Sequence, residues 1–229
     1  QRQMCIRDSL HTANVLAEFI DNDSDGIPDD ADVLKYLVEN NYVVPVWTTP
    51  DREGFWKKAR GTYCEDNVSM RASMYYDDDE WALGGIKKKG TWDVNLEEVW
   101  HVVTAGWSGT YPEAFGIDNP SLLTDAMDVA RGGNFEDVPS KYPSEAWYTY
   151  YDESCGYQCQ ASEYIYWALM ANIGALDPKL TAKCERSAHE WYICTATELQ
   201  TKDVLISRLR NDKGFQLPIR IPDGSYQSS

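Results

Sequence analysis

The sequence predicts an α+β protein, with a small mixed β-sheet followed by a mainly helical C-terminal half. Three observations support this fold class. Apolar residues recur at helical spacing on both sides of an acidic stretch at 21–32. Segments with the composition of strands lie between residues 42 and 86, and after Gly90 the periodicity becomes helical. Strands followed by a run of helices are typical of α+β proteins.

The first predicted element is a helix-loop-helix at residues 10–41. Its apolar positions are Leu10, Val15, Leu16, Phe19 and Ile20 before the loop, and Val33, Leu34, Leu37 and Val38 after it. The spacing of both sets places them on one helical face.

The loop between these helices has the ligand spacing of a calcium site. Its carboxylates are at positions 1, 3, 5, 9 and 12, namely Asp21, Asp23, Asp25, Asp29 and Asp32. Gly26 at position 6 supplies the tight turn that brings six to eight oxygens to about 2.3–2.6 Å from a calcium ion. We expect direct coordination by the first three aspartates, one carbonyl oxygen from Ile27, and closure by Asp32.

This segment resembles an EF-hand, and its loop is also similar to those of dockerins and thrombospondin type 3 repeats. Two positions depart from the EF-hand pattern: Asp32 replaces a longer glutamate, and Pro28 removes a backbone N–H. The chain has one such loop, whereas the similar families carry theirs in pairs or tandem. We therefore expect a solitary, structural calcium site that does not switch conformation.

Residues 42–229 are predicted to form one α+β domain. Strands are expected at 42–47, 68–76 and 81–86, and helices at 51–60, 95–105, 121–131, 144–151, 158–173, 182–194 and 201–210. Pro45 has no backbone N–H to donate, so we expect the first strand to lie at an edge of the sheet or to bend there. Gly132 is expected to end the helix at 121–131.

Composition excludes several classes of partner. A net charge of −16 argues against binding to nucleic acid and to anionic membrane surfaces. The sequence contains no apolar run near the roughly 18 residues that a membrane span needs. The nine Trp and fifteen Tyr residues favour a core role, with a sugar-stacking surface or an aromatic cleft as alternatives.

Residues 1–9 differ in character from the rest of the chain. They resemble translated sequencing-adapter sequence of the kind found at the ends of metagenomic reading frames, so we expect the native N-terminus and any signal peptide to be missing. Of the cysteines after this segment, Cys155, Cys159, Cys184 and Cys194 could form two disulfides and leave Cys64 odd. Disulfides and a calcium site both favour a secreted or extracytoplasmic protein.

Catalytic residue types gather in the predicted helix at 95–105. Glu97 and His101 are four residues apart and share a helical face, while Glu98 lies three residues before the histidine. This spacing is that of the H-E-x-x-H zinc helix with its first histidine replaced by Glu97.

On these residues the chain resembles a degenerate zincin metallopeptidase of the glutamate-zincin branch. The resemblance implies a mixed sheet before the helix, zinc bound by Glu97, His101 and a later glutamate, and Glu98 as the general base. Glu163 matches the later glutamate, and Tyr164 or Tyr166 would stabilise the oxyanion. A peptide or protein would be the substrate.

Other functions compete with this interpretation. A single histidine on an apolar helix is often a core residue, and acidic residues near a helix N-terminus complement its dipole. The acidic run at 77–80 is compatible with a glycosidase, because a pair of carboxylates can hydrolyse a glycosidic bond. However, four successive acidic residues usually form a solvated turn. The main alternative is a non-catalytic, calcium-stabilised protein that binds a carbohydrate or a protein.

Overall fold

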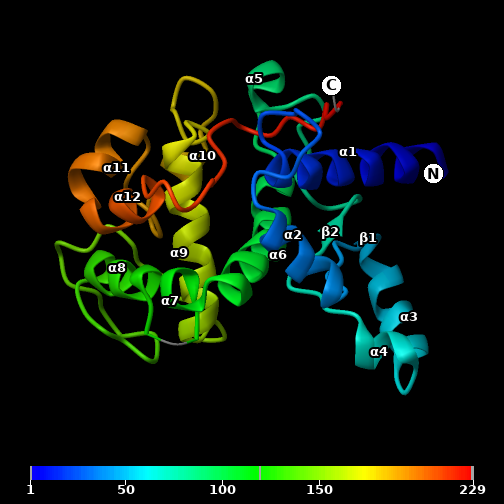
Figure 1. The fold of residues 1–229 in the computed structure, drawn as a ribbon, viewed down its shortest axis with the longest axis horizontal. Helices are drawn as coiled ribbons and strands as arrows, with labels where there is room; N and C mark the ends of the chain where they lie inside the picture. The colour runs from blue at the N-terminus through cyan, green and yellow to red at the C-terminus, as the bar shows by residue number, and fades with distance from the viewer. Residues whose placement is uncertain (1, 119, 228–229) are drawn as a thin grey trace. The chain divides into compact units, whose positions relative to one another are not determined.

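The computed structural model describes residues 2–118 and 120–227, and its chain forms two compact units (Figure 1). The first unit comprises Gln1–Gly106 together with Pro222–Ser229, and the second comprises Trp107–Ile221. Helices dominate both units, and the first also contains a small sheet. The α+β prediction is therefore confirmed at this coarse level.

The first unit begins with the helices that flank the acidic loop. Its elements in chain order are α1 (Arg2–Ile20), α2 (Ala31–Glu39), β1 (Val46–Trp47), α3 (Thr49–Ala59), α4 (Tyr63–Asn67), β2 (Met74–Tyr75), α5 (Ile86–Lys89) and α6 (Asn95–Thr110). The unit boundary falls within α6. Helix α1 includes residues 2–9 of the segment that resembles adapter sequence, and Asp8 among them is buried.

The sheet is smaller than predicted. Strands β1 and β2 pair in parallel, with Val46 opposite Met74 and Trp47 opposite Tyr75, so the sheet is parallel rather than mixed. The predicted strand at 81–86 is wrong. Gly84 and Gly85 both have positive φ angles of 85° and 88°, which end any extended run, and α5 begins directly after them.

The core of the first unit lies against α6. The Phe19 and Trp100 rings are 5.2 Å apart between centroids, and both side chains are buried. Gly106 allows α2 to approach closely, because a β-carbon there would lie 2.9 Å from the side chains of Val33 and Leu37. Helix α6 is therefore held by packing along its length, which fixes the side chains that it carries.

The second unit is helical. Its elements are α7 (Pro112–Phe115), α8 (Leu122–Arg131), α9 (Tyr157–Asn172), α10 (Lys183–Arg186), α11 (Ala196–Lys202) and α12 (Val204–Arg210). Helix α8 shows why the prediction for 121–131 succeeded. Ser121 and Thr124 form a capping box at its start, and Gly132 ends it with a φ of 78°.

Two predicted helices of the second unit are wrong. Residues 144–151 form turns and an isolated antiparallel bridge from Tyr148 to Trp191, and only Lys183–Arg186 of the predicted 182–194 is helical. Both errors have one cause. The buried rings of Tyr148, Trp191 and Tyr164 pack together, with centroids 5.5–6.3 Å apart, and this tertiary packing overrides local helix propensity.

Two disulfides stabilise the second unit. Cys155 pairs with Cys159 and Cys184 with Cys194, while Cys64 in the first unit is an exposed free thiol. The prediction of two disulfides is confirmed, and they are compatible with an extracellular location. Among the described residues, no helix is long and apolar enough to cross a membrane.

Candidate metal sites

Three carboxylates of the loop between α1 and α2 converge. Oxygen atoms of Asp21, Asp23 and Asp29 all lie within 4.8 Å of one another. Oxygens bound to one calcium ion at about 2.3–2.6 Å can be up to about 5 Å apart, so this spacing fits calcium. The three side chains therefore offer carboxylate oxygens at a separation that is compatible with one bound metal ion.

Backbone amides hold Asp21 in place. The Gly26 N–H donates to Asp21 Oδ2 at 2.8 Å, and the Asp25 N–H donates to Asp21 Oδ1 at 3.1 Å. Gly26 has a φ of 87°, a conformation that side chains disfavour, so the predicted need for glycine at position 6 is confirmed.

Two carboxyl groups of the loop have pKa values shifted in opposite directions. Burial acts to raise the pKa of Asp21, but hydrogen bonds from Tyr226 and from the amides of Gly26 and Asp25 lower it overall. Burial raises the pKa of Asp29, and the negative charges of Asp23 and Asp21 add to this effect. A bound dication would relieve that repulsion.

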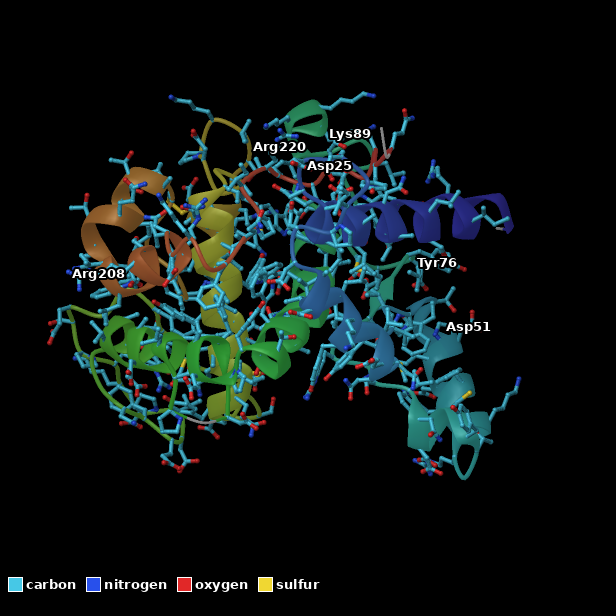
Figure 2. The ribbon with its side chains drawn as sticks, in the orientation of Figure 1. Asp25, Asp51, Tyr76, Lys89, Arg208 and Arg220 are labelled. Atoms are coloured by element: carbon cyan, nitrogen blue, oxygen red, sulfur yellow. A yellow bond between two sulfur atoms is a disulfide. The ribbon has the colours of Figure 1, made fainter. Side chains whose placement is uncertain are left out.

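The remaining predicted ligands have separate roles in this structure. Asp25, labelled in Figure 2, accepts the Ile27 N–H at 2.8 Å. Asp32 is exposed in the first turn of α2, where Asp30 is the N-cap and accepts the N–H groups of Asp32 and Val33. Coordination by Asp25, Ile27 and Asp32 stays a prediction.

Sequence reasoning missed two contacts of this loop. The Asn22 N–H donates to Asp29 Oδ2 at 2.8 Å, and the Tyr226 hydroxyl donates to Asp21 Oδ2 at 2.6 Å. Tyr226 is 205 residues from Asp21 along the chain, so no local sequence pattern could have predicted this contact.

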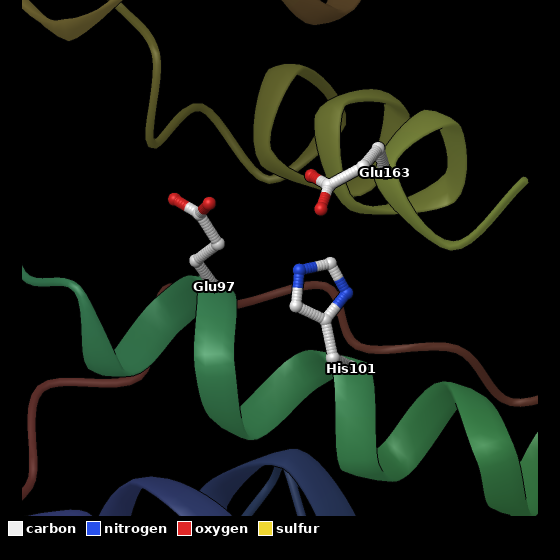
Figure 3. A group of neighbouring side chains, drawn as sticks. All are labelled: Glu97, His101 and Glu163. Carbon is white, nitrogen blue, oxygen red and sulfur yellow. The ribbon is translucent and has the colours of Figure 1, made fainter. Parts of the chain in front are cut away.

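The second candidate site is on α6. Glu97 and His101 project from the same side of this helix, whereas Glu163 is carried by α9 (Figure 3). A carboxylate oxygen of Glu97 and a ring nitrogen of His101 lie within 4.8 Å of each other. Two zinc ligands at about 2.0–2.2 Å from the ion are at most about 4.4 Å apart, so a small side-chain adjustment would let this pair share one zinc.

Glu98 lies beside this pair, and its carboxyl group has a raised pKa. Burial raises its pKa to about 7, with Glu97 adding to the increase and His101 opposing it. Its carboxylate Oε2 accepts the Ser73 N–H at 3.3 Å, in the chain just before β2. A carboxyl group with a pKa near neutrality suits a general base.

The predicted residues of α9 lie in the second unit. Glu163 is half-buried, and its charge adds to the effect of burial in raising the pKa of Tyr148. The Tyr164 hydroxyl donates to Asp203 Oδ2 at 2.7 Å. Tyr166 is fully buried, with its ring 4.7 Å from that of Trp167.

Surface cavities are also found among the described residues of the second unit. One, of about 350 Å³, is acidic and is lined by Asp118, Pro120, Thr124, Asp125, Asp128, Asn134, Glu136, Tyr157 and Gln158. Another, of about 380 Å³, is mainly apolar and is lined by Trp147, Tyr192, Ile193, Thr197, Glu198, Thr201 and Lys202. Tyr192 is about half exposed, and Lys202 Nζ lies 4.9 Å from the centroid of the Trp147 ring.

Comparison with protein-family models, with curated proteins and with solved structures finds no match. The assignment of function therefore depends on the chemistry of these side chains.

Proposed function

We propose that this chain is a calcium-binding protein that hydrolyses peptide bonds at a zinc site formed by Glu97, His101 and Glu163. The observation that carries the proposal is the pairing of Glu97 and His101 on one side of α6, with their ligand atoms within 4.8 Å. Imidazole nitrogen and carboxylate oxygen are both zinc ligands, so these residues fit the metal. Glu163 is included because it matches, in its position along the sequence, the later glutamate ligand that the zincin resemblance implies.

The reaction assigns distinct tasks to the neighbouring residues. Zinc would supply a Lewis acid and lower the pKa of a bound water. Glu98 would accept a proton from that water and pass it to the amine nitrogen that leaves when the peptide C–N bond breaks. Tyr164 or Tyr166 would stabilise the oxyanion, and Tyr164 would first have to release its hydrogen bond to Asp203. Glu97 in place of histidine would add negative charge at the metal and so make a zinc-bound water less acidic than in a histidine-rich site.

Zinc analysis tests this proposal. Purified protein dialysed against zinc at pH 7 should retain one zinc per chain, and H101A and E163Q should each lose it. H189A is the matched control, since His189 is exposed in the second unit. E98Q should retain zinc but lose hydrolysis of a fluorescently labelled, unfolded protein substrate. Equal zinc content in H101A and the unmutated protein would overturn the assignment.

The calcium site belongs to the same proposal. Asp21, Asp23, Asp25 and Asp32, with the Ile27 carbonyl and Asp29 at position 9, would surround one structural ion. Calorimetric titration should show one calcium per chain, and D23N should weaken binding by at least tenfold, because one of the converging charges is removed. A large conformational change on calcium binding would contradict the structural role. Secretion would place the loop where calcium is plentiful.

A second candidate function is favoured by the apolar cavity of the second unit. Trp147 and the exposed ring of Tyr192 could stack on a sugar, or accept an apolar side chain of a protein, without any catalysis. Tryptophan fluorescence titrated with a panel of oligosaccharides tests this alternative. Binding that Y192A abolishes, in a protein that retains no zinc, would decide for the binding protein over the peptidase.

A further inference from the structure

The segment Asp223–Tyr226, here called the closing segment, is held against α1 by one carboxylate. Glu18 Oε2 accepts the N–H groups of Asp223 and Gly224, both at 2.8 Å, and Oε1 accepts the Ser225 N–H at 3.0 Å. Asn14 Nδ2 also donates to the Gly224 carbonyl at 2.9 Å. Charge-assisted bonds of this kind are stronger than neutral ones, so the segment has a defined position on the helix.

Steric contacts fix the register of the closing segment. Gly224 has a φ of 75°, and a β-carbon at this position would overlap the His11 ring. That ring is itself anchored, because His11 Nε2 lies 2.6 Å from Asp93 Oδ2 in a buried pair. A β-carbon on Gly85 would likewise overlap the Asp223 side chain. The segment therefore cannot slide by a residue without a clash.

In this register the Tyr226 hydroxyl reaches the calcium loop. It donates to Asp21 Oδ2 at 2.6 Å, and the same oxygen accepts the Gly26 N–H at 2.8 Å. The other oxygen, Oδ1, accepts a longer bond of 3.1 Å from the Asp25 N–H. A carboxylate oxygen has two lone pairs, so the two hydrogen bonds to Oδ2 leave Oδ1 as the oxygen with more capacity to bind a cation.

We infer that Tyr226 is a positioning residue of the calcium site, which orients Asp21 and makes the closing segment part of that site. This inference rests on the proposed binding of calcium in the loop. Hydrogen-bond partners of metal ligands typically contribute 10- to 100-fold to metal affinity. By linkage, calcium must strengthen the attachment of the closing segment as much as that attachment strengthens calcium binding.

Calcium titration of Y226F tests the inference. Its calcium affinity should fall by about tenfold or more, because Asp21 loses the bond that orients it. Y151F makes the same chemical change at an exposed tyrosine of the second unit and should leave the affinity unchanged. Hydrogen exchange of the amides of residues 223–225 supplies a second readout in the unmutated protein. Exchange should slow on adding calcium, and this dependence should be lost in Y226F.

The outcomes separate the inference from the proposal beneath it. Absence of calcium binding in the unmutated protein would overturn both. Calcium binding that Y226F retains within twofold would overturn the positioning role alone. If Y226F does not fold, exchange at residues 223–225 that is the same with and without calcium in the unmutated protein overturns the role as well.

Discussion

Replacing Arg131 with methionine should strongly destabilise the protein. The arginine is fully buried at the end of α8, and its guanidinium makes three hydrogen bonds. Nη2 donates to Asp128 Oδ1 at 2.6 Å, and Nη1 donates to Gln160 Oε1 at 2.8 Å and to the Phe135 carbonyl at 3.1 Å. Its guanidinium carbon also lies 5.0 Å from the centroid of the Tyr157 ring.

The magnitude depends on the groups that the substitution leaves without a partner. Removing one partner of a buried ion pair costs about 3–5 kcal/mol, because the other charge stays buried without compensation. Asp128 is 19% exposed, so water can replace part of the lost interaction, and we expect the lower end, about 3 kcal/mol. For a chain of this length that corresponds to a fall in Tm of about 6–12 °C.

Urea unfolding followed by tryptophan fluorescence measures this effect. R208M is the control, since Arg208 is exposed on α12 (Figure 2), and its substitution should change stability by less than about 0.5 kcal/mol. R131K should be intermediate, because it keeps the charge but loses the planar fork that reaches several acceptors. A loss below about 1 kcal/mol in R131M would refute the argument that this network stabilises the second unit.

Three further predictions concern the cap of α2, the calcium loop and a buried carboxylate. D30A should cost about 1 kcal/mol of unfolding free energy, since Asp30 caps α2, and urea unfolding would show it. G26A should weaken calcium binding by about tenfold, because a left-handed residue other than glycine costs about 1–2 kcal/mol; G54A, within α3 and free of steric contacts, should not. Burial raises the pKa of Asp203, so its contribution to stability is present below the ordinary aspartate pKa and lost as pH rises through the raised value. The stability of D203N relative to the unmutated protein should therefore improve between pH 4 and pH 7, and a constant difference would contradict this.

The success of a sequence-based prediction depended on whether the signal was local. Helix α8 was predicted because Ser121 caps it and Gly132 ends it within the same stretch of sequence. The segment 144–151 was mispredicted because Tyr148 forms a bridge to Trp191, which is 43 residues away. The pairing with Trp191 determines the backbone conformation of this segment, and the sequence pattern within the segment does not indicate that pairing.

In the candidate sites, too, local features were predicted and long-range features were not. The spacing of Asp21, Asp23 and Asp29 around Gly26 predicted the acidic cluster, because all three carboxylates come from one stretch of twelve residues. The bond from Tyr226 to Asp21 could not be predicted, because it joins positions 205 residues apart. On α6, helical spacing alone placed Glu97 beside His101, whereas the elevated pKa of Glu98 arises from burial that only the folded chain creates.

The return of residues 222–227 to the first unit has a consequence for biosynthesis. The second unit is a continuous insertion between two parts of the first, so the ribosome completes residues 107–221 before it makes the closing segment. Until then, Glu18 lacks the amides of residues 223–225, and Asp21 lacks the Tyr226 hydroxyl. The acidic loop is translated before the second unit, yet it acquires its contact with Tyr226 only after the second unit has been synthesised.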